Sequence, residues 1–131
     1  MPGLTNYSLA TIIPTSSQTW AGFFTVAPDD DGTGGTEATG SGYARAAVSS
    51  WVTTEVSGVR YRETGADVAF AALTADLDDI VAWGVWDAVS GGNLLAWGPL
   101  LDVSGNEVTQ TFTSGNQPRF STGELKIGIE D

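Results

Sequence analysis

Carboxylates are the reactive side chains that this sequence offers in quantity. Its 131 residues include 16 Asp and Glu against five Lys and Arg, with no His and no Cys. Paired carboxylates hydrolyse glycosides, but nothing in the spacing of these sixteen selects a pair. Without His the chain lacks the commonest general base and metal ligand, and without Cys it lacks a thiolate. No GxSxG, SxxK or HExxH motif is present. We therefore expect a protein that is not an enzyme, with no catalytic residue, cofactor or metal.

A run of three carboxylates, Asp29 to Asp31, invites a calcium interpretation, because hard cations take clustered oxygen ligands. The run fails the spacing of an EF-hand loop: counted from Asp29, the fifth position is Thr33 and the twelfth is Gly40. The alternative is a solvated acidic turn. The sequence leaves open whether this turn binds a cation.

The formal net charge of −11 restricts the partners. Phosphate groups are bound by clustered Lys and Arg, so we expect no direct contact with nucleic acid or with a membrane. An electrostatic partner should present a basic surface. Arg45, one of only five cations, is expected to pair with local carboxylates. Five Trp, three Tyr and five Phe suit either a carbohydrate platform or a packed core.

Abundant Gly, Thr, Ser and Val predict an all-β fold, organised around a β-hairpin over residues 79–101. We expect its loop at 88–92, with Asp87 opposite Asn93. This register places Val85 opposite Leu95 and Trp83 opposite Trp97 on one face.

The other face of the first hairpin strand is also apolar, since it carries Ile80, Ala82, Gly84 and Trp86. Both faces should therefore be covered. A sandwich core would cover one, and a flanking segment or another subunit the other. We expect Trp86 to be buried by that second cover.

The remaining strands are expected at 19–27, 43–48, 49–56, 59–63, 66–71, 107–113 and 123–129, with a long exposed loop at 28–42 and turns at 74–79, 102–106 and 114–119. In the first of these strands, Trp20, Gly22, Phe24 and Val26 should share one face. About eight strands joined by Gly-rich turns predict an antiparallel β-sandwich or jelly roll. We expect one such domain over residues 18–131, preceded by an N-terminal arm, residues 1–17.

The arm is apolar in patches, at Leu4, Tyr7, Leu9, Ile12 and Ile13, and we expect one helical turn after Asn6. It shows neither a signal-peptide pattern nor a membrane span. It either forms an edge strand or cover for the open face of the hairpin, or reaches a neighbouring subunit. The candidate interface residues are these five, Trp86, and the cations Arg60 and Arg62.

Three segments together resemble small virion proteins of tailed bacteriophages, of the capsid-decoration (cement) or tail-fibre-like type. They are GSGYARAAV at 40–48, VAWGVWDAVSGGNLLAWGPL at 81–100 and FSTGELKIGI at 120–129. The resemblance implies a β-sandwich module without catalytic residues. It implies a structural role as a decoration protein on the capsid exterior, made in the host cytoplasm, that binds and stabilises the major capsid protein shell as a homo-oligomer such as a homotrimer.

Two other functions fit the same fold. The first is a tail-fibre or head-fibre protein that contacts a host surface glycan through the loops at 28–42 and 114–119. The second is a carbohydrate-binding β-sandwich module or hydrolase unrelated to virions.

Overall fold

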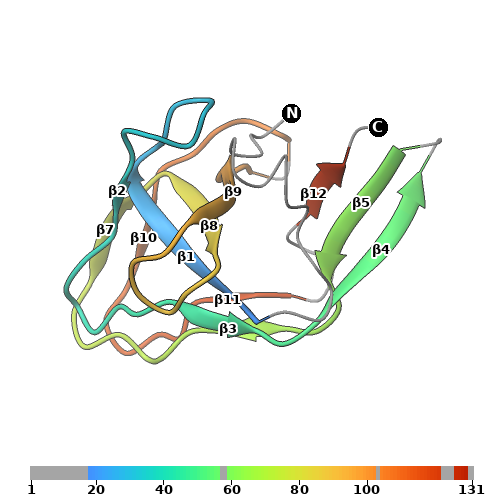
Figure 1. The fold of residues 1–131 in the computed structure, drawn as a ribbon. Coiled ribbons are helices and arrows are strands. Elements are labelled where there is room, and N and C mark those ends of the chain that lie inside the picture. Colours follow the sequence, from blue (N-terminus) through green and yellow to red (C-terminus); the bar gives the residue numbers. More distant parts are fainter. Residues whose placement is uncertain (1–17, 57–58, 103, 122–125, 130–131) are drawn as a thin grey trace.

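The fold is built from short antiparallel β-strands, as Figure 1 shows for the computed structural model. The structure describes residues 18–56, 59–102, 104–121 and 126–129, and for 53–56, 59–62 and 126–129 it describes the backbone alone. The all-β class is confirmed, with twelve strands in these ranges where about eight were expected. The strands are β1 (Thr19–Val26), β2 (Thr36–Glu37), β3 (Ala46–Val48), β4 (Trp51–Val56), β5 (Val59–Thr64), β6 (Val68–Ala69), β7 (Leu77–Ile80), β8 (Ala82–Trp86), β9 (Leu94–Pro99), β10 (Gln110–Phe112), β11 (Arg119–Phe120) and β12 (Lys126–Ile129).

The main sheet has β1 at its centre. Strand β8 pairs with one side of β1 from Trp20↔Trp86 to Phe24↔Ala82, and β3 and β2 pair with successive parts of the other side. Strand β9 continues the sheet beyond β8. Because the sequence of β1 is apolar on both faces, a central position suits it.

Three smaller sheets complete the described fold: β10 with β7, β11 with β6, and the meander β12-β5-β4. The three-stranded meander lies to one side of the other strands in Figure 1. The strands predicted around residues 49–56 and 59–63 are confirmed as β4 and β5, which pair along their full length.

Phe23 of β1 organises the core. Its ring stacks on Phe70 at 4.7 Å between centroids and lies 5.0 Å from Phe112 and 5.5 Å from Phe120. These partners come from three other segments of the chain, so one buried side chain ties the main sheet to the β10–β7 and β11–β6 sheets.

The opposite face of the main sheet carries a second apolar group, which we call the outer cluster. Its buried members are Phe24, Ala82 and Trp86, and Val81, Leu94 and Trp97 pack against them, partly buried. The expectation that both hairpin faces are apolar is therefore confirmed. The predicted division of β1 into two faces also holds, because Ala21 and Phe23 lie in the core and Phe24 in the outer cluster.

The predicted hairpin register is wrong beyond its loop. Asp87 does lie opposite Asn93, whose carbonyl accepts its N–H at 3.1 Å. The pairing then shifts, however, from Trp86↔Leu94 to Val85↔Ala96. This β-bulge inserts Leu95 as an extra residue, which lets both it and Ala96 face the core.

Because of the bulge, Trp83 and Trp97 are not cross-strand partners. Trp83 pairs with Gly98 and packs in the core, whereas Trp97 lies opposite Gly84 in the outer cluster. The expected face of Ile80 is also wrong. It is buried in the core, because β7 pairs with β10 and the chain passes to β8 only after Val81.

Several predicted boundaries also change. The segment 28–42 is not loop throughout, since it contains β2, and Ala38 next to it is buried. Strand β7 begins within the segment 74–79, where a turn was expected. The strand expected at 66–71 is present only as the shorter β6. The arm, residues 1–17, lies outside the described residues.

Candidate functional site

Trp86 is the one predicted interface residue whose side chain the structure describes. It is 6% exposed, but its predicted cover by the arm or by another subunit stays a prediction, because the arm lies outside the described residues. Its ring lies 5.1 Å from that of Phe24, and the guanidinium carbon of Arg45 lies 4.0 Å from its centre. Described residues of the same chain thus cover much of Trp86.

The other interface predictions remain untested. Arg60 and Arg62 lie on β5, at positions where only the backbone is described. The arm residues Leu4, Tyr7, Leu9, Ile12 and Ile13 lie outside the described ranges.

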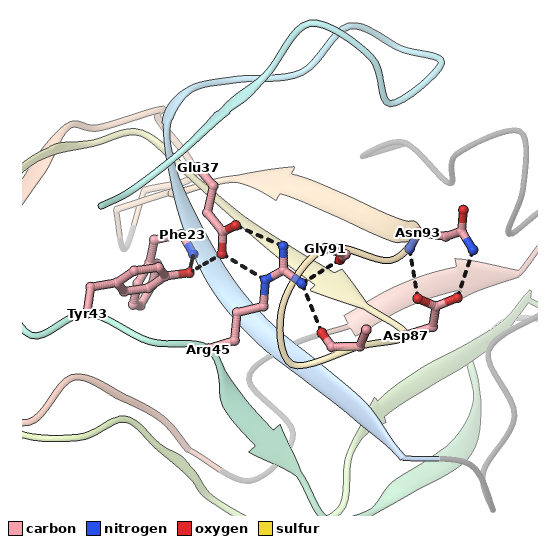
Figure 2. Close-up of polar contacts among 8 residues, drawn as sticks. Phe23, Glu37, Tyr43, Arg45, Asp87, Gly91 and Asn93 are labelled. Carbon is pink, nitrogen blue, oxygen red and sulfur yellow. Dashed lines mark hydrogen bonds and ion pairs between the residues drawn. The ribbon is translucent and has the colours of Figure 1, made fainter. Parts of the chain in front are cut away.

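Arg45 forms a bidentate ion pair with Glu37, which Figure 2 shows above the main sheet. Its Nε donates to Glu37 Oε2 and its Nη2 donates to Oε1, both at 2.8 Å. The Arg45 side chain is 7% exposed and that of Glu37 is 27% exposed. Two parallel charge-assisted bonds of this kind fix both position and orientation. The expectation that Arg45 pairs with a local carboxylate is confirmed.

The third guanidinium nitrogen of Arg45 holds the hairpin loop. Its Nη1 donates to the carbonyls of Ala88 at 2.9 Å and Gly91 at 2.8 Å. Each of the three nitrogens therefore has an acceptor within the protein. We refer to Arg45, Glu37, Tyr43 and these two carbonyls as the Arg45 clasp.

Tyr43 joins the Arg45 clasp to strand β1. Its hydroxyl donates to Glu37 Oε2 at 2.7 Å and accepts the backbone N–H of Phe23 at 3.1 Å. Burial, reinforced by the hydrogen bond to Glu37, raises the pKa of the Tyr43 phenol well above its usual range. Tyr43 therefore stays a neutral donor across the whole physiological pH range.

The hairpin loop is closed by a separate contact, also drawn in Figure 2. Asp87 Oδ1 accepts the backbone N–H of Asn93 at 2.7 Å, and its Oδ2 accepts the Asn93 side-chain amide at 3.0 Å. These bonds, with the backbone one the stronger, hold the pKa of Asp87 below its usual value. Gly91 and Gly92 supply the positive φ angles of the turn.

An open hollow of about 330 Å³ lies beside the clasp. It is lined by residues 37–40, 43–45 and 89–91, which come from β2, the approach to β3 and the hairpin loop. Its walls are polar and apolar in about equal measure, and the exposed Val89 supplies an apolar edge.

The two loops predicted to contact a glycan come together through a third segment, 73–76. Thr74 donates its backbone N–H to the Ser41 carbonyl at 2.8 Å. From the other loop, Ser114 donates its N–H to Asp76 Oδ1 at 2.8 Å, and Gly115 donates its N–H to the Leu73 carbonyl at 2.9 Å. Part of each loop therefore lies at the same end of the molecule.

The acidic run forms a local turn. Asp31 Oδ1 accepts the Thr33 backbone N–H at 3.0 Å and its hydroxyl at 2.6 Å, which lowers the pKa of Asp31, with the hydroxyl as the main cause. Within the described ranges, no group of three or more His, Cys, Asp or Glu is arranged to hold a metal ion.

Sequence reasoning missed most of the clasp. Tyr43 and Arg45 are two residues apart in an extended segment, which predicts side chains on the same side. The partner Glu37 gave no such signal, because it sits in a segment expected to be loop. The acceptors on Ala88 and Gly91 are backbone carbonyls. Every residue type has one, so the sequence gives no signal for them.

The Arg45 clasp holds segments of the chain in position. Its charges and hydrogen bonds fix residues 37–45 and the hairpin loop to the main sheet, and they cover the outer cluster at Trp86. A site of this kind is typical of a structural all-β protein.

The family model of the podophage GP4 fiber I protein gp80 matches residues 4–128, and the chain belongs to this family. The chain is therefore a structural fibre protein of a phage virion, which confirms the coarser part of the resemblance seen in the sequence. No curated protein matches the sequence. The described part of the chain has no helix long and apolar enough to span a membrane.

Proposed function

We propose that the protein is a non-catalytic fibre subunit that works as a homotrimer within the virion. The family match over residues 4–128 carries the fibre part of this proposal, and the Arg45 clasp supports its non-catalytic part. Its guanidinium, a group suited to binding anionic ligands, is 7% exposed and donates from every nitrogen to groups of its own chain. A guanidinium whose nitrogens all donate within its own chain is better suited to stabilising the fold than to binding a substrate.

The outer cluster supports self-association. Val81, Leu94 and Trp97 remain partly exposed on the face opposite the core. The indole N–H of Trp97 is buried and has no acceptor among the described residues. A buried donor without a partner is unfavourable by about 1–3 kcal/mol.

The oligomeric state tests this proposal. Native mass spectrometry of the full chain is expected to give three times the monomer mass of 13.6 kDa. Deleting residues 1–13 should weaken the trimer while leaving the β-type circular dichroism unchanged. A monomer at micromolar concentrations would overturn the proposal.

Two placements in the virion are open to this trimer. Membership of a fibre family supports a place on a tail or head fibre. The capsid-decoration role remains the second candidate, with the major capsid protein as partner. Decoration predicts that the purified protein adds to undecorated shells and raises their heat resistance by binding linkage, and no binding to such shells would reject it.

A host glycan is a further candidate ligand for the fibre placement. The hollow beside the clasp supports it, because a wall that is half polar and half apolar can contact both the hydroxyls and the apolar face of a sugar ring. Titration with host surface polysaccharide, followed by Trp fluorescence, should give a saturable change that Val89→Asp abolishes. An unchanged response in that variant would reject the hollow as the site.

A further inference from the structure

The guanidinium of Arg45 keeps one donor that no described residue uses. An Arg side chain carries five N–H groups. Nε donates once, to Glu37, and Nη1 donates twice, once to each of the two loop carbonyls. Nη2 carries two N–H groups and donates one of them, to Glu37. The second N–H of Nη2 therefore has no acceptor among the described residues.

Glu37 keeps one acceptor site in the same place. A carboxylate offers about four lone-pair sites, two on each oxygen. Oε2 accepts from the Tyr43 hydroxyl and from Arg45 Nε, whereas Oε1 accepts only from Arg45 Nη2. The unused N–H and the unused lone pair thus belong to two atoms that lie 2.8 Å apart.

Adjacent hydroxyl groups of a sugar ring are complementary to this pair. A hydroxyl both donates and accepts, and the oxygens of gauche hydroxyls on neighbouring ring carbons lie at about hydrogen-bond distance from each other. One hydroxyl can accept from Nη2 while its neighbour donates to Oε1. Arg45 and Glu37 both line the hollow of about 330 Å³ beside the clasp. This volume lies at the lower end of the range for small-ligand sites, about 300–1,000 Å³.

The charge of the hollow disfavours acidic sugars. Among the described residues of its lining, Arg45 and Glu37 are the only charged ones, and they form an ion pair with each other. With four N–H groups in use, Arg45 cannot offer the two parallel bonds that bind a carboxylate. The chain also carries a net charge of −11, which repels an anion.

We propose that the hollow binds a neutral hexose unit of a glycan, with two adjacent hydroxyls held by Arg45 and Glu37. The inference rests on the glycan ligand proposed for the fibre placement and names its chemical class. The four internal bonds that hold Arg45 also fix the direction of its remaining N–H. The site is therefore ordered before the sugar arrives, which reduces the entropic cost of binding.

Saturation-transfer NMR with the full chain tests the class of ligand. The probes are the methyl glycosides of glucose, galactose and mannose, each compared with the methyl glycoside of its uronic acid at low ionic strength. At least one neutral glycoside should bind, and its uronic acid should bind about tenfold more weakly because the field of the chain is negative. Equal or tighter binding of the uronic acid would overturn the inference and leave a glycan ligand standing.

A series of monodeoxy analogues tests the two hydroxyls. Removing either of two adjacent hydroxyls should weaken binding by about fivefold, the loss of one hydrogen bond, whereas removing the others should have little effect. A uniform effect of all the hydroxyls would contradict the assigned contacts.

Chemical shifts locate the site. When the neutral glycoside is added, the Arg45 Nε–H and the backbone amides of Thr39 and Gly91 should shift, because these residues line the hollow. The amide of Gln110 is the control, since it lies on β10, outside this lining. Shifts confined to other parts of the chain would reject the hollow as the site.

Glu37→Gln tests the ion pair. This change leaves the guanidinium charge uncompensated, so the preference for the neutral sugar over its uronic acid should disappear or reverse. Circular dichroism checks that the variant folds, and the comparisons in the parent protein need no variant. An unchanged preference in the folded variant would overturn the inference.

Native mass spectrometry separates this inference from the proposed trimer. A trimer that binds none of these glycosides would reject the inference and leave the fibre trimer standing. A monomer that binds the neutral glycoside with these shifts would reject the trimer and support the inference.

Discussion

The guanidinium carbon of Arg45 lies 4.0 Å from the centre of the Trp86 ring, so a cation covers one of the largest apolar side chains of the outer cluster. A cation–π contact at a desolvated position contributes more than one in water. The same guanidinium binds Glu37 and the hairpin loop. One side chain thus links two loops to the outer face of the main sheet.

Arg45→Lys should destabilise the protein although it keeps the charge. A lysine cannot make the bidentate bond to Glu37 and also reach the loop carbonyls. We expect the free energy of unfolding to fall by about 1.5–3 kcal/mol, measured by urea denaturation. Arg119→Lys is the control, because its pair with Asp67 is exposed and should contribute under about 1 kcal/mol. Equal losses in both variants would show that the clasp does not stabilise the fold.

Tyr43→Phe should lower the free energy of unfolding by about 1–3 kcal/mol. The change removes the donor to Glu37 and leaves the backbone N–H of Phe23 without its acceptor. Amide hydrogen exchange at Phe23 should accelerate accordingly. Unchanged exchange at that amide would contradict the assigned bond.

Asp87→Asn should make stability less dependent on pH in acid. The pKa of Asp87 is lower in the folded protein than the value of about 3.9 expected when unfolded. Its stabilising contribution is therefore complete above about pH 4 and is lost as the pH falls through the folded pKa. The parent protein should exceed the variant in stability at pH 7, and this difference should shrink below about pH 4. A difference that stays constant down to pH 2 would contradict the assignment.

Gly84→Ala should destabilise the outer cluster by overpacking. A Cβ at this position would lie 2.6 Å from the Phe24 ring and 2.8 Å from that of Trp86. We expect a loss of about 1–3 kcal/mol in the free energy of unfolding. In a Phe24→Leu background the penalty should shrink, because the nearer ring is gone, and an equal penalty in both backgrounds would refute the steric cause.

The strands with clear alternation were predictable from the sequence. Strand β1 and its two faces follow from period-two apolar spacing, and the hairpin loop follows from its Ser-Gly-Gly turn signal. The bulge at Leu95 was not predictable, because two adjacent leucines fit either register. The strand β2 was missed because its two residues, Thr36 and Glu37, owe their conformation to pairing with β1 rather than to their own propensity.

The candidate site was predictable only in outline. The scarcity of cations correctly indicated that Arg45 pairs with a carboxylate, but the choice of Glu37 depends on how a Gly-rich segment folds back over the sheet. Tertiary contacts of this kind leave no periodic signal in the sequence.

The copy number of this chain in purified virions tests the account most directly. Quantitative mass spectrometry against the major capsid protein should give a small multiple of three, far below the number of capsid subunits. The absence of the chain from purified particles, or a copy number equal to that of the capsid protein, would contradict a trimeric fibre subunit.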